Sequence, residues 1–316
     1  MKPKIAVSIG DPNGIGPEIA LRAHNKISSF CTPVYFAGFD LLNAAARRLK
    51  MEVPEKMIHR SPAAAPEIRP GIAAAESGAY SFASFKKGVE SVKSGECDAI
   101  VTLPVNKEAW MRSGIPYKGH TDFLRDLFKR DAIMMLGCKR LYVALFTEHT
   151  PLKDVPKRIE KGALVRFLTD LQREVGAEKI GVLGLNPHAG DHGVLGSEER
   201  IIEEAIEEAN SYFTKSGTHP VFEGPMVPDT AFTPASRERY RYLVAMYHDQ
   251  GLAPLKALYF EESINISLNL PIVRTSVDHG TAYDIAYMPN RSVSLKSYIE
   301  AAAAAVELAA KRSQRS

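Results

Sequence analysis

The sequence has few cysteines, no long hydrophobic run and little excess charge, and each absence excludes a class of protein. Its three cysteines, Cys31, Cys97 and Cys138, lie far apart, so we expect neither a disulfide framework nor cysteine-bound zinc. With 40 basic and 37 acidic residues, the formal charge of +3 does not indicate nucleic acid as a partner. No apolar run reaches the roughly 18 residues of a membrane span, and the N-terminus lacks a signal-peptide pattern. We therefore expect a reduced, cytoplasmic enzyme or binding protein.

Apolar residues make up 45% of the 316 residues, enough to bury a large core. Short apolar runs alternate with segments of helical periodicity, and this alternation predicts an α/β fold with a largely parallel sheet. Strands are predicted over residues 4–9, 33–37, 98–103, 132–136, 141–146, 179–185, 242–245 and 264–276, the last broken at Pro271. Helices are predicted over residues 41–49, 80–92, 159–175 and 294–311. The remaining expectations are an antiparallel pair of 132–136 with 141–146, a cap at Ser197, a loop over 220–234, and a polar loop entering a short helix over 278–286.

The glycine-rich segment Gly10-Asp-Pro-Asn-Gly-Ile-Gly-Pro-Glu18 joins the first predicted strand to a helix. Such a turn can cradle phosphate, because free backbone N–H groups and the helix dipole attract anions. Its spacing, however, matches neither a dinucleotide fingerprint nor a Walker loop. The alternative is a tight turn whose glycines supply positive φ and whose Pro17 starts the helix. Both interpretations stay open, with Asp11 and Asn13 as candidate ligands.

A second candidate anion site is the segment Gly119-His-Thr-Asp-Phe-Leu124, which opens a helix. Here His120 and Thr121 could hold an anionic group through backbone and hydroxyl donors at the helix N-terminus. The alternative is that Thr121 or Asp122 only caps the helix.

Three histidines follow predicted strands in polar segments that contain glycine or proline: His149, His188 and His248. One such histidine is more often structural than a ligand, but three in similar settings predict a metal site with a position open for substrate. Imidazole ligands suit Zn²⁺ or Co²⁺, and also allow Mn²⁺ or Mg²⁺ if oxygen ligands join. The large sequence separations mean that only the fold, or a dimer, could assemble the site. The side chains expected to orient the imidazoles or to carry protons are Asp191, His192 and Asp249.

Two cations lie near these segments in the sequence, Lys256 and Arg274, with Asn265 between them. A solvated surface charge is the ordinary interpretation of either side chain. Arg274, however, follows an apolar Pro-Ile-Val run and precedes Thr-Ser, so it is expected to point into a cleft. A fixed guanidinium there would suit a carboxylate or a phosphate.

Five segments together resemble the family of 4-hydroxythreonine-4-phosphate dehydrogenases of vitamin B6 biosynthesis. They span the chain from end to end and occur in the family's order. The segments are Gly10-Asp-Pro-Asn-Gly-Ile-Gly-Pro-Glu18, Gly119-His-Thr-Asp122, Asn186-Pro-His-Ala-Gly190, Tyr247-His-Asp-Gln-Gly251 and Arg274-Thr-Ser-Val-Asp-His-Gly-Thr-Ala282.

The resemblance implies a two-lobed α/β fold similar to the isocitrate and isopropylmalate dehydrogenases, with a mixed, largely parallel sheet and a central cleft. One lobe would be built in part from about residues 1–125 and 250–316, and the other from about residues 126–249. The resemblance also implies a homodimer in which both subunits contribute to each active site.

The resemblance implies roles for individual residues as well. A divalent ion, zinc, cobalt or magnesium, would be bound by His149, His188 and His248. The substrate would contact His120, Thr121, Lys256, Asn265 and Arg274. Residues 279–286 are similar to the adenosine-binding loop of the related dehydrogenases. This similarity places NAD or NADP at His279, Gly280 and Asp284 without a Rossmann glycine fingerprint.

The implied reaction oxidises 4-phosphohydroxythreonine to a 2-amino-3-oxo acid phosphate, which loses CO₂ to give 3-amino-2-oxopropyl phosphate. The ion would lower the pKa of the substrate hydroxyl, and hydride would pass to the nicotinamide. Candidates for the group that takes the hydroxyl proton are Asp249, Lys256 and a water molecule at the ion. The alternatives are a sibling dehydrogenase acting on 4-phosphothreonate or on a cyclic diol carboxylate, a metal-dependent hydrolase, and a binding protein without catalysis.

Overall fold

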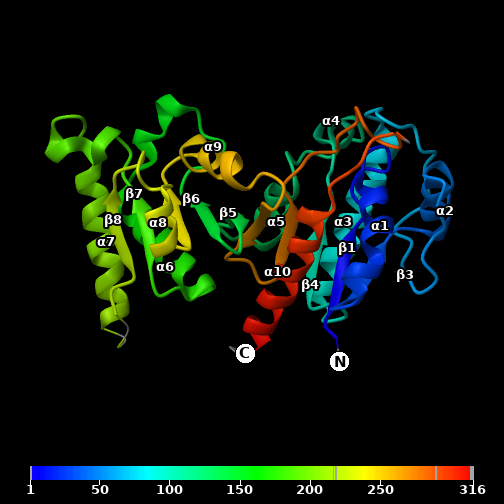
Figure 1. Ribbon diagram of the computed structural model, residues 1–316, viewed down its shortest axis with the longest axis horizontal. Coiled ribbons are helices and arrows are strands. Elements are labelled where there is room, and N and C mark those ends of the chain that lie inside the picture. The colour runs from blue at the N-terminus through cyan, green and yellow to red at the C-terminus, as the bar shows by residue number, and fades with distance from the viewer. Residues whose placement is uncertain (1, 216, 218, 289, 314–316) are drawn as a thin grey trace. The chain divides into compact units, whose positions relative to one another are not determined.

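The computed structural model describes residues 2–215, 217, 219–288 and 290–313 (Figure 1). The chain divides into two compact units, each built of strands and helices. Unit 1 comprises Met1–Ala132 and Ile264–Ser316, and unit 2 comprises Ile133–Ser263. The second boundary falls after helix α9 (His248–Tyr259), because this helix packs against the strands of unit 2.

The strands of unit 1 lie in the order β3-β2-β1-β4-β11-β10, and all neighbours are parallel except β10 and β11. Their bounds are β1 Lys4–Ser8, β2 Thr32–Phe36, β3 Ile58–His59, β4 Ala99–Thr102, β10 Ile264–Leu268 and β11 Arg274–Val277. The helices are α1 Gly16–Ser28, α2 Phe39–Arg48, α3 Ala75–Lys93, α4 Lys107–Arg112, α5 His120–Phe128 and α10 Lys296–Ser313. Both α3 and α10 pack against β1 and β4, which explains why these strands are apolar and buried.

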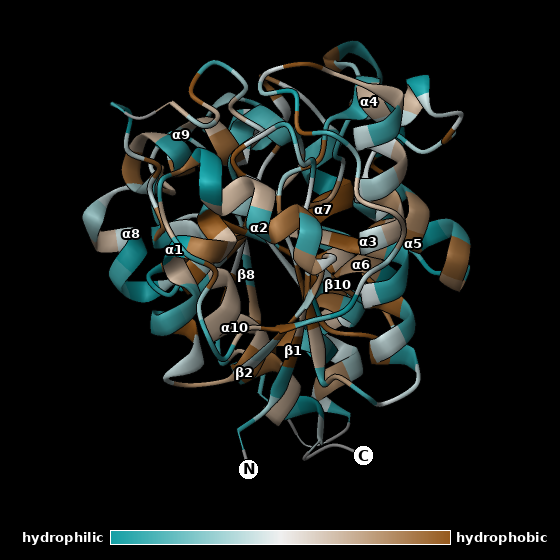
Figure 2. Ribbon diagram, turned by 90° about the vertical axis from the view of Figure 1, so that its right-hand side faces the viewer, coloured by the Kyte–Doolittle hydropathy of each residue, from teal (hydrophilic) through white to brown (hydrophobic). Residues whose placement is uncertain are grey.

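The strands of unit 2 lie in the order β5-β6-β9-β7-β8, with only β5 and β6 antiparallel. Their bounds are β5 Ile133–Cys138, β6 Leu141–Leu145, β7 Ile180–Leu183, β8 Phe222–Met226 and β9 Tyr242–Ala245. The helices are α6 Lys161–Val175, α7 Glu198–Thr214, α8 Pro234–Arg239 and α9, and the short 3₁₀ segments are η1 Leu152–Asp154, η2 Pro156–Arg158 and η3 Pro187–Gly193. Figure 2 shows the expected distribution, with hydrophobic residues on the strands and hydrophilic residues on outward-facing helix turns.

The α/β class and the mixed, largely parallel strand arrangement predicted from the sequence are confirmed, including the antiparallel β5–β6 pair. Three local expectations are wrong. Residues 220–234 contain β8, and residues 278–286 form turns instead of entering a helix. Ser197 precedes α7 without a side-chain capping hydrogen bond, and its own backbone N–H donates to the Glu198 carboxylate. In the part of the chain that is described, no helix has both the length and the hydrophobicity needed to cross a membrane.

Candidate active site

The three predicted metal-binding histidines follow three adjacent parallel strands of unit 2. His149 comes after β6, His248 after β9 and His188 after β7, and these strands are neighbours in the order β6-β9-β7. Because parallel strands end at the same edge of a sheet, all three segments emerge at one edge. The pairing even continues past β6, where the Thr147 N–H donates to the Met246 carbonyl oxygen at 3.2 Å.

Two of the imidazoles, those of His149 and His248, lie side by side with ring centres 5.7 Å apart. Two imidazoles bound to one zinc ion through bonds of about 2.0–2.1 Å have ring centres roughly 5–6 Å apart, so this pair fits a shared ion. Nδ1 of His248 lies 2.7 Å from Oδ1 of Asp249. That contact leaves Nε2 of His248 available and identifies Asp249 as the group that orients the ring.

Gln250, which the sequence interpretation did not single out, connects the ends of β9 and β7. Its Oε1 accepts the Met246 N–H at 2.7 Å, and its Nε2 donates to the Gly184 carbonyl oxygen at 2.7 Å. The amide therefore fixes the start of α9 relative to the end of β7. The only sequence signal for this role is its place in the His-Asp-Gln-Gly turn after the strand.

His188 lies in η3, where five consecutive residues from His188 to His192 have φ between 45° and 77°. Its side chain is exposed, and so are the side chains of Asp191 and His192. Among the described residues, no group of three or more His, Cys, Asp or Glu side chains is arranged to hold a metal ion. The three-histidine site and the orienting roles of Asp191 and His192 therefore stay predictions.

In unit 1, Arg274 is only 2% exposed and is held by hydroxyl groups. Its Nε and Nη2 donate to Oγ1 of Thr102 at 3.1 and 2.7 Å, and its Nη1 donates to Oγ of Ser267 at 3.0 Å. The antiparallel register of β10 and β11 places Ser267 opposite Arg274, and Asn265 lies two residues before Ser267 on the same face. Burial lowers the pKa of Arg274 to about 9, so the guanidinium is still charged at neutral pH. A buried cation held by neutral groups is a site suited to an anion.

His120 begins α5 beside this guanidinium, and its ring packs edge-on against Phe85 and Trp110. Burial, and then the charge of Arg274, holds the pKa of His120 well below its usual range, so the imidazole is neutral. Nε2 of His120 and Oδ1 of Asn265 are both buried without a protein hydrogen-bond partner. The helix is not capped by Thr121; instead, Asp122 accepts the Lys118 backbone N–H at 3.0 Å. The unpartnered atoms of His120 and Asn265 could therefore bind the polar groups of a ligand beside Arg274.

The glycine-rich turn after β1 is a structural turn, because its groups are used within the protein. The backbone N–H groups of Asp11, Asn13, Gly14 and Ile15 donate to Pro104 O, Asp11 Oδ1, Asp11 O and Thr281 O. Only Gly10 has positive φ, at 74°, whereas Gly16 is required for space: a Cβ there would lie 2.3 Å from the Ile9 carbonyl oxygen. The N–H groups of this turn are therefore not free to bind a phosphate, and the phosphate-cradle interpretation of residues 10–18 is wrong. The expectation that its glycines supply positive φ holds for Gly10 alone.

The candidate cofactor segment around residues 279–284 is fastened to that same turn. The Tyr283 hydroxyl donates to Oδ2 of Asp11 at 2.9 Å, and the Tyr287 hydroxyl donates to the Pro12 carbonyl oxygen at 2.7 Å. Burial raises the pKa of Asp11, although three hydrogen bonds oppose this effect. Gly280 and Asp284 are exposed, and burial lowers the pKa of His279. Gly280 and Asp284 are thus open to solvent or ligand, whereas both ring nitrogens of His279 are buried without a protein hydrogen-bond partner.

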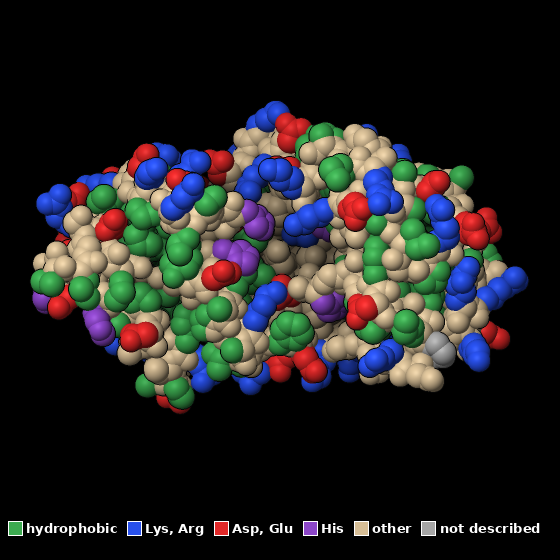
Figure 3. All heavy atoms as spheres, turned by 90° about the horizontal axis from the view of Figure 1, so that it is seen from above, with side chains coloured by type: hydrophobic (Ala, Val, Ile, Leu, Met, Phe, Trp, Pro, Cys, Tyr) green, Lys and Arg blue, Asp and Glu red, His purple; other side chains and the backbone are tan. Residues whose placement is uncertain are grey.

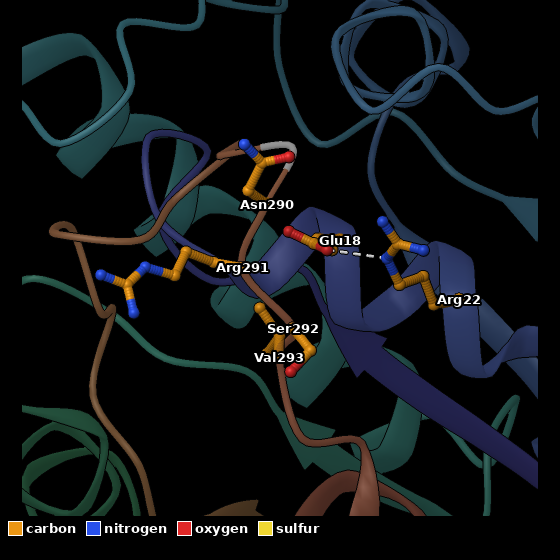
Figure 4. A pocket seen from close by; sticks show the side chains of 6 residues that line it. All are labelled: Glu18, Arg22, Asn290, Arg291, Ser292 and Val293. Carbon is orange, nitrogen blue, oxygen red and sulfur yellow. Dashed lines mark hydrogen bonds and ion pairs between the residues drawn. The ribbon is translucent and has the colours of Figure 1, made fainter.

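A depression of about 500 Å³ is lined in part by residues 290–293, which follow this segment in the sequence (Figure 4). Figure 4 shows Glu18 and Arg22 on α1 joined by a hydrogen bond of 2.7 Å, beside the chain at residues 290–293. Neither residue was a candidate from the sequence, although their spacing of four residues in the first turns of a helix was visible there. The side chains that line the depression are Glu18, Arg22, Asn290, Arg291, Ser292 and Val293.

The remaining candidate is Lys256, which lies in unit 2, on α9, and is half-buried. Asp249, on the same helix, is exposed. Over the face drawn in Figure 3, basic and acidic side chains are interspersed, as expected from the balanced composition.

These features define an α/β protein with paired histidines after the ends of two strands in one unit, and a buried guanidinium at the start of β11 in the other. The model of the family "Pyridoxal phosphate biosynthetic protein PdxA" matches residues 29–305, and the chain belongs to this family. The 4-hydroxythreonine-4-phosphate dehydrogenase of Sulfurimonas denitrificans is 52% identical over 307 residues, which cover 97% of this chain and 98% of the relative.

Solved structures agree with this assignment. The crystal structure of 4-hydroxythreonine-4-phosphate dehydrogenase from Klebsiella pneumoniae matches with a TM-score of 0.81 and 30% identity, covering 98% of each chain. A terephthalate 1,2-cis-dihydrodiol dehydrogenase from Burkholderia xenovorans matches with a TM-score of 0.67 and 26% identity, covering 97% of this chain and 98% of the other. The family resemblance predicted from the five sequence segments is confirmed.

Proposed function

We propose that this protein is a 4-hydroxythreonine-4-phosphate dehydrogenase, an oxidoreductase of pyridoxal phosphate biosynthesis that uses NAD or NADP. The observation that carries the proposal is the 52% identity, over nearly the whole chain, to the enzyme of that name from Sulfurimonas denitrificans. The buried guanidinium of unit 1 supports it, because the substrate carries a phosphate and a carboxylate.

Arg274 is the group that we assign to an anionic part of the substrate. Its hydroxyl partners, Thr102 and Ser267, hold the guanidinium in place without neutralising it. An anion that enters gains charge-assisted hydrogen bonds in a buried setting. The neutral His120 and the amide of Asn265 offer unpartnered atoms for the substrate's polar groups. Thr121 and Lys256 are further substrate contacts, which the family resemblance implies.

We assign His149, His188 and His248 as ligands of a divalent ion, zinc, cobalt or magnesium. Bound there, such an ion would supply a Lewis acid that makes the substrate hydroxyl easier to deprotonate. The Asp249 carboxylate holds the His248 ring through Nδ1. The group that accepts the proton of the substrate hydroxyl is assigned to Asp249 or Lys256. The variants Asp249→Asn and Lys256→Met distinguish the two, because the variant that lacks the proton acceptor should no longer oxidise the substrate.

Residues His279, Gly280 and Asp284 are proposed to contact the nicotinamide cofactor, on a segment that Asp11 and Tyr283 hold in place. The proposal includes a cytoplasmic homodimer whose subunits share each active site. Sedimentation and activity measured together over a dilution series test it, since activity should fall as the dimer dissociates. An active monomer would contradict the shared site.

The decisive experiment follows NADH absorbance with metal-loaded protein and 4-phosphohydroxythreonine, with His248→Ala as control. Turnover that is lost in the variant supports both the substrate and the histidine's role. Activity on 4-phosphothreonate alone would move the substrate but keep the reaction class.

A second candidate substrate is a cyclic diol carboxylate, which the similarity to the dihydrodiol dehydrogenase favours. The same assay tests it with a cis-dihydrodiol carboxylate. If neither NAD nor NADP is reduced with any of these substrates, the dehydrogenase proposal fails.

A further inference from the structure

The turn that carries His188 has an unusual backbone, because it is left-handed over consecutive residues with side chains. His188, Ala189, Asp191 and His192 have φ of 53°, 52°, 45° and 54°. L-residues avoid this region, because Cβ approaches the following carbonyl oxygen. Such a run persists only where surrounding groups hold it, and it marks segments whose geometry serves a ligand or a reaction.

The buried carboxylate of Glu199 holds the start of this turn through hydrogen bonds. Glu199 is 5% exposed and lies in the first turn of α7. Its Oε1 accepts the Leu185 and Asn186 backbone N–H groups at 2.9 and 2.7 Å. Its Oε2 accepts Nδ2 of Asn186 at 2.9 Å, and the same amide donates to Oε2 of Glu198 at 2.8 Å. One carboxylate thus fixes both the backbone and the side chain of the residue two positions before His188.

Two glycines of this segment make room for the Glu199 carboxylate and for the Asn186 amide. A Cβ on Gly190 would lie 2.6 Å from Oε2 of Glu199, and a Cβ on Gly196 would lie 2.1 Å from Nδ2 of Asn186. The Leu195 N–H donates to the Gly190 carbonyl oxygen at 3.0 Å, which closes the turn. The His188 side chain itself is exposed.

We propose that Glu199 is a positioning residue, which acts through Asn186 and the left-handed turn to hold the His188 imidazole where it binds a divalent cation. The inference rests on the proposed role of His188 as a metal ligand. Glu199 itself touches neither metal nor substrate, since its oxygens are committed to Leu185 and Asn186. Residues that orient metal ligands typically change metal affinity 10- to 100-fold when they are replaced.

Calorimetric titration of the metal-free full-length protein with Co²⁺ measures this effect directly, without an activity assay. The variant Glu199→Gln keeps an acceptor for the two backbone N–H groups but not one for Nδ2 of Asn186. It is expected to weaken Co²⁺ binding about 10- to 100-fold. Asn186→Ala, which changes no charge, is expected to do the same. The matched control is Glu203→Gln, which removes a carboxylate from the exposed side of the same helix and should leave the affinity unchanged.

A double-mutant cycle with His188→Ala separates positioning from general damage. The single variant His188→Ala should weaken Co²⁺ binding, and adding Glu199→Gln should then weaken it no further. The visible spectrum of bound Co²⁺ should change in the same way for Glu199→Gln as for His188→Ala, because both lose one imidazole ligand.

Two results would overturn the inference alone. One is normal Co²⁺ affinity in Glu199→Gln while His188→Ala is impaired. The other is an equal further loss from Glu199→Gln in the His188→Ala background, which would mean that the carboxylate only supports the fold. Unchanged affinity in His188→Ala would instead overturn the ligand role of His188 on which the inference rests.

Discussion

Two glycine-rich turns of this protein follow buried strands and enter helices, but they do opposite things with their polar groups. The turn at residues 10–16 in unit 1 directs its groups inward, to Pro104, Thr281 and Tyr283. The turn at residues 186–196 in unit 2 is anchored by Glu199 at its start and exposes His188, Asp191 and His192. A glycine-rich turn after a strand is therefore a binding element only when the protein leaves its side chains or N–H groups unused.

The largest effect should come from adding a Cβ to each turn. Gly10→Ala would place a methyl group 2.3 Å from the Pro104 carbonyl oxygen at φ of 74°, and should cost about 3 kcal/mol of unfolding free energy. Gly193→Ala also has positive φ, at 94°, but its Cβ meets nothing within 4 Å, so it should cost about 1 kcal/mol. Urea unfolding measures both. Equal costs would mean that the two turns are packed alike.

Hydrogen exchange should separate the two turns next. The amides of Asp11, Asn13, Gly14 and Ile15 should be protected with or without metal, since their acceptors belong to the protein. The amides of Ala189, Val194 and Leu195 should exchange faster in metal-free protein and slow by about tenfold or more when Zn²⁺ is added, because binding stabilises the bound conformation. Protection in unit 2 that does not respond to Zn²⁺ would contradict this expectation.

A smaller effect is expected from removing one hydroxyl. Tyr283→Phe removes the shorter of the two hydrogen bonds to Oδ2 of the buried Asp11 and leaves only the Ser77 hydroxyl at 3.3 Å, so it should destabilise unit 1 by about 1–2 kcal/mol. The control is Tyr212→Phe, whose hydroxyl accepts from Arg173 at a side chain that is 47% exposed. That change should cost no more than about 0.5 kcal/mol. Similar costs would show that Asp11 does not depend on the contact.

The smallest effect concerns pH and the buried His120. Its pKa is lowered in the folded protein, so below the ordinary histidine pKa of 6.5 the unfolded chain binds a proton that the folded protein does not. Stability should therefore fall as the pH falls below 6.5. His120→Gln should reduce this fall by about 1 kcal/mol between pH 6.5 and pH 5.5. Urea unfolding at both pH values checks this, and an unchanged slope in His120→Gln would contradict the buried neutral imidazole.

Local patterns were sufficient for most elements, because apolar runs and helical periodicity reflect which residues are buried. They failed at β8, whose sequence Phe-Glu-Gly-Pro-Met has no strand pattern. It forms an edge strand because β7 offers it a partner, and an edge strand tolerates a proline without an N–H group. They also failed at Ser197, whose side chain makes no capping hydrogen bond to the first turn of α7.

The sequence alone was enough to predict the α/β class, the family and the approximate positions of most strands, because these depend on composition and short motifs. It could not show that β6 and β9 are neighbours, and this pairing brings His149 and His248 to 5.7 Å. Nor could it show that Asp11 meets Tyr283, 272 residues away, or that Glu199 lies beneath the His188 turn. These contacts depend on which strands and helices pack together, and local periodicity carries no information about the partner across such a distance.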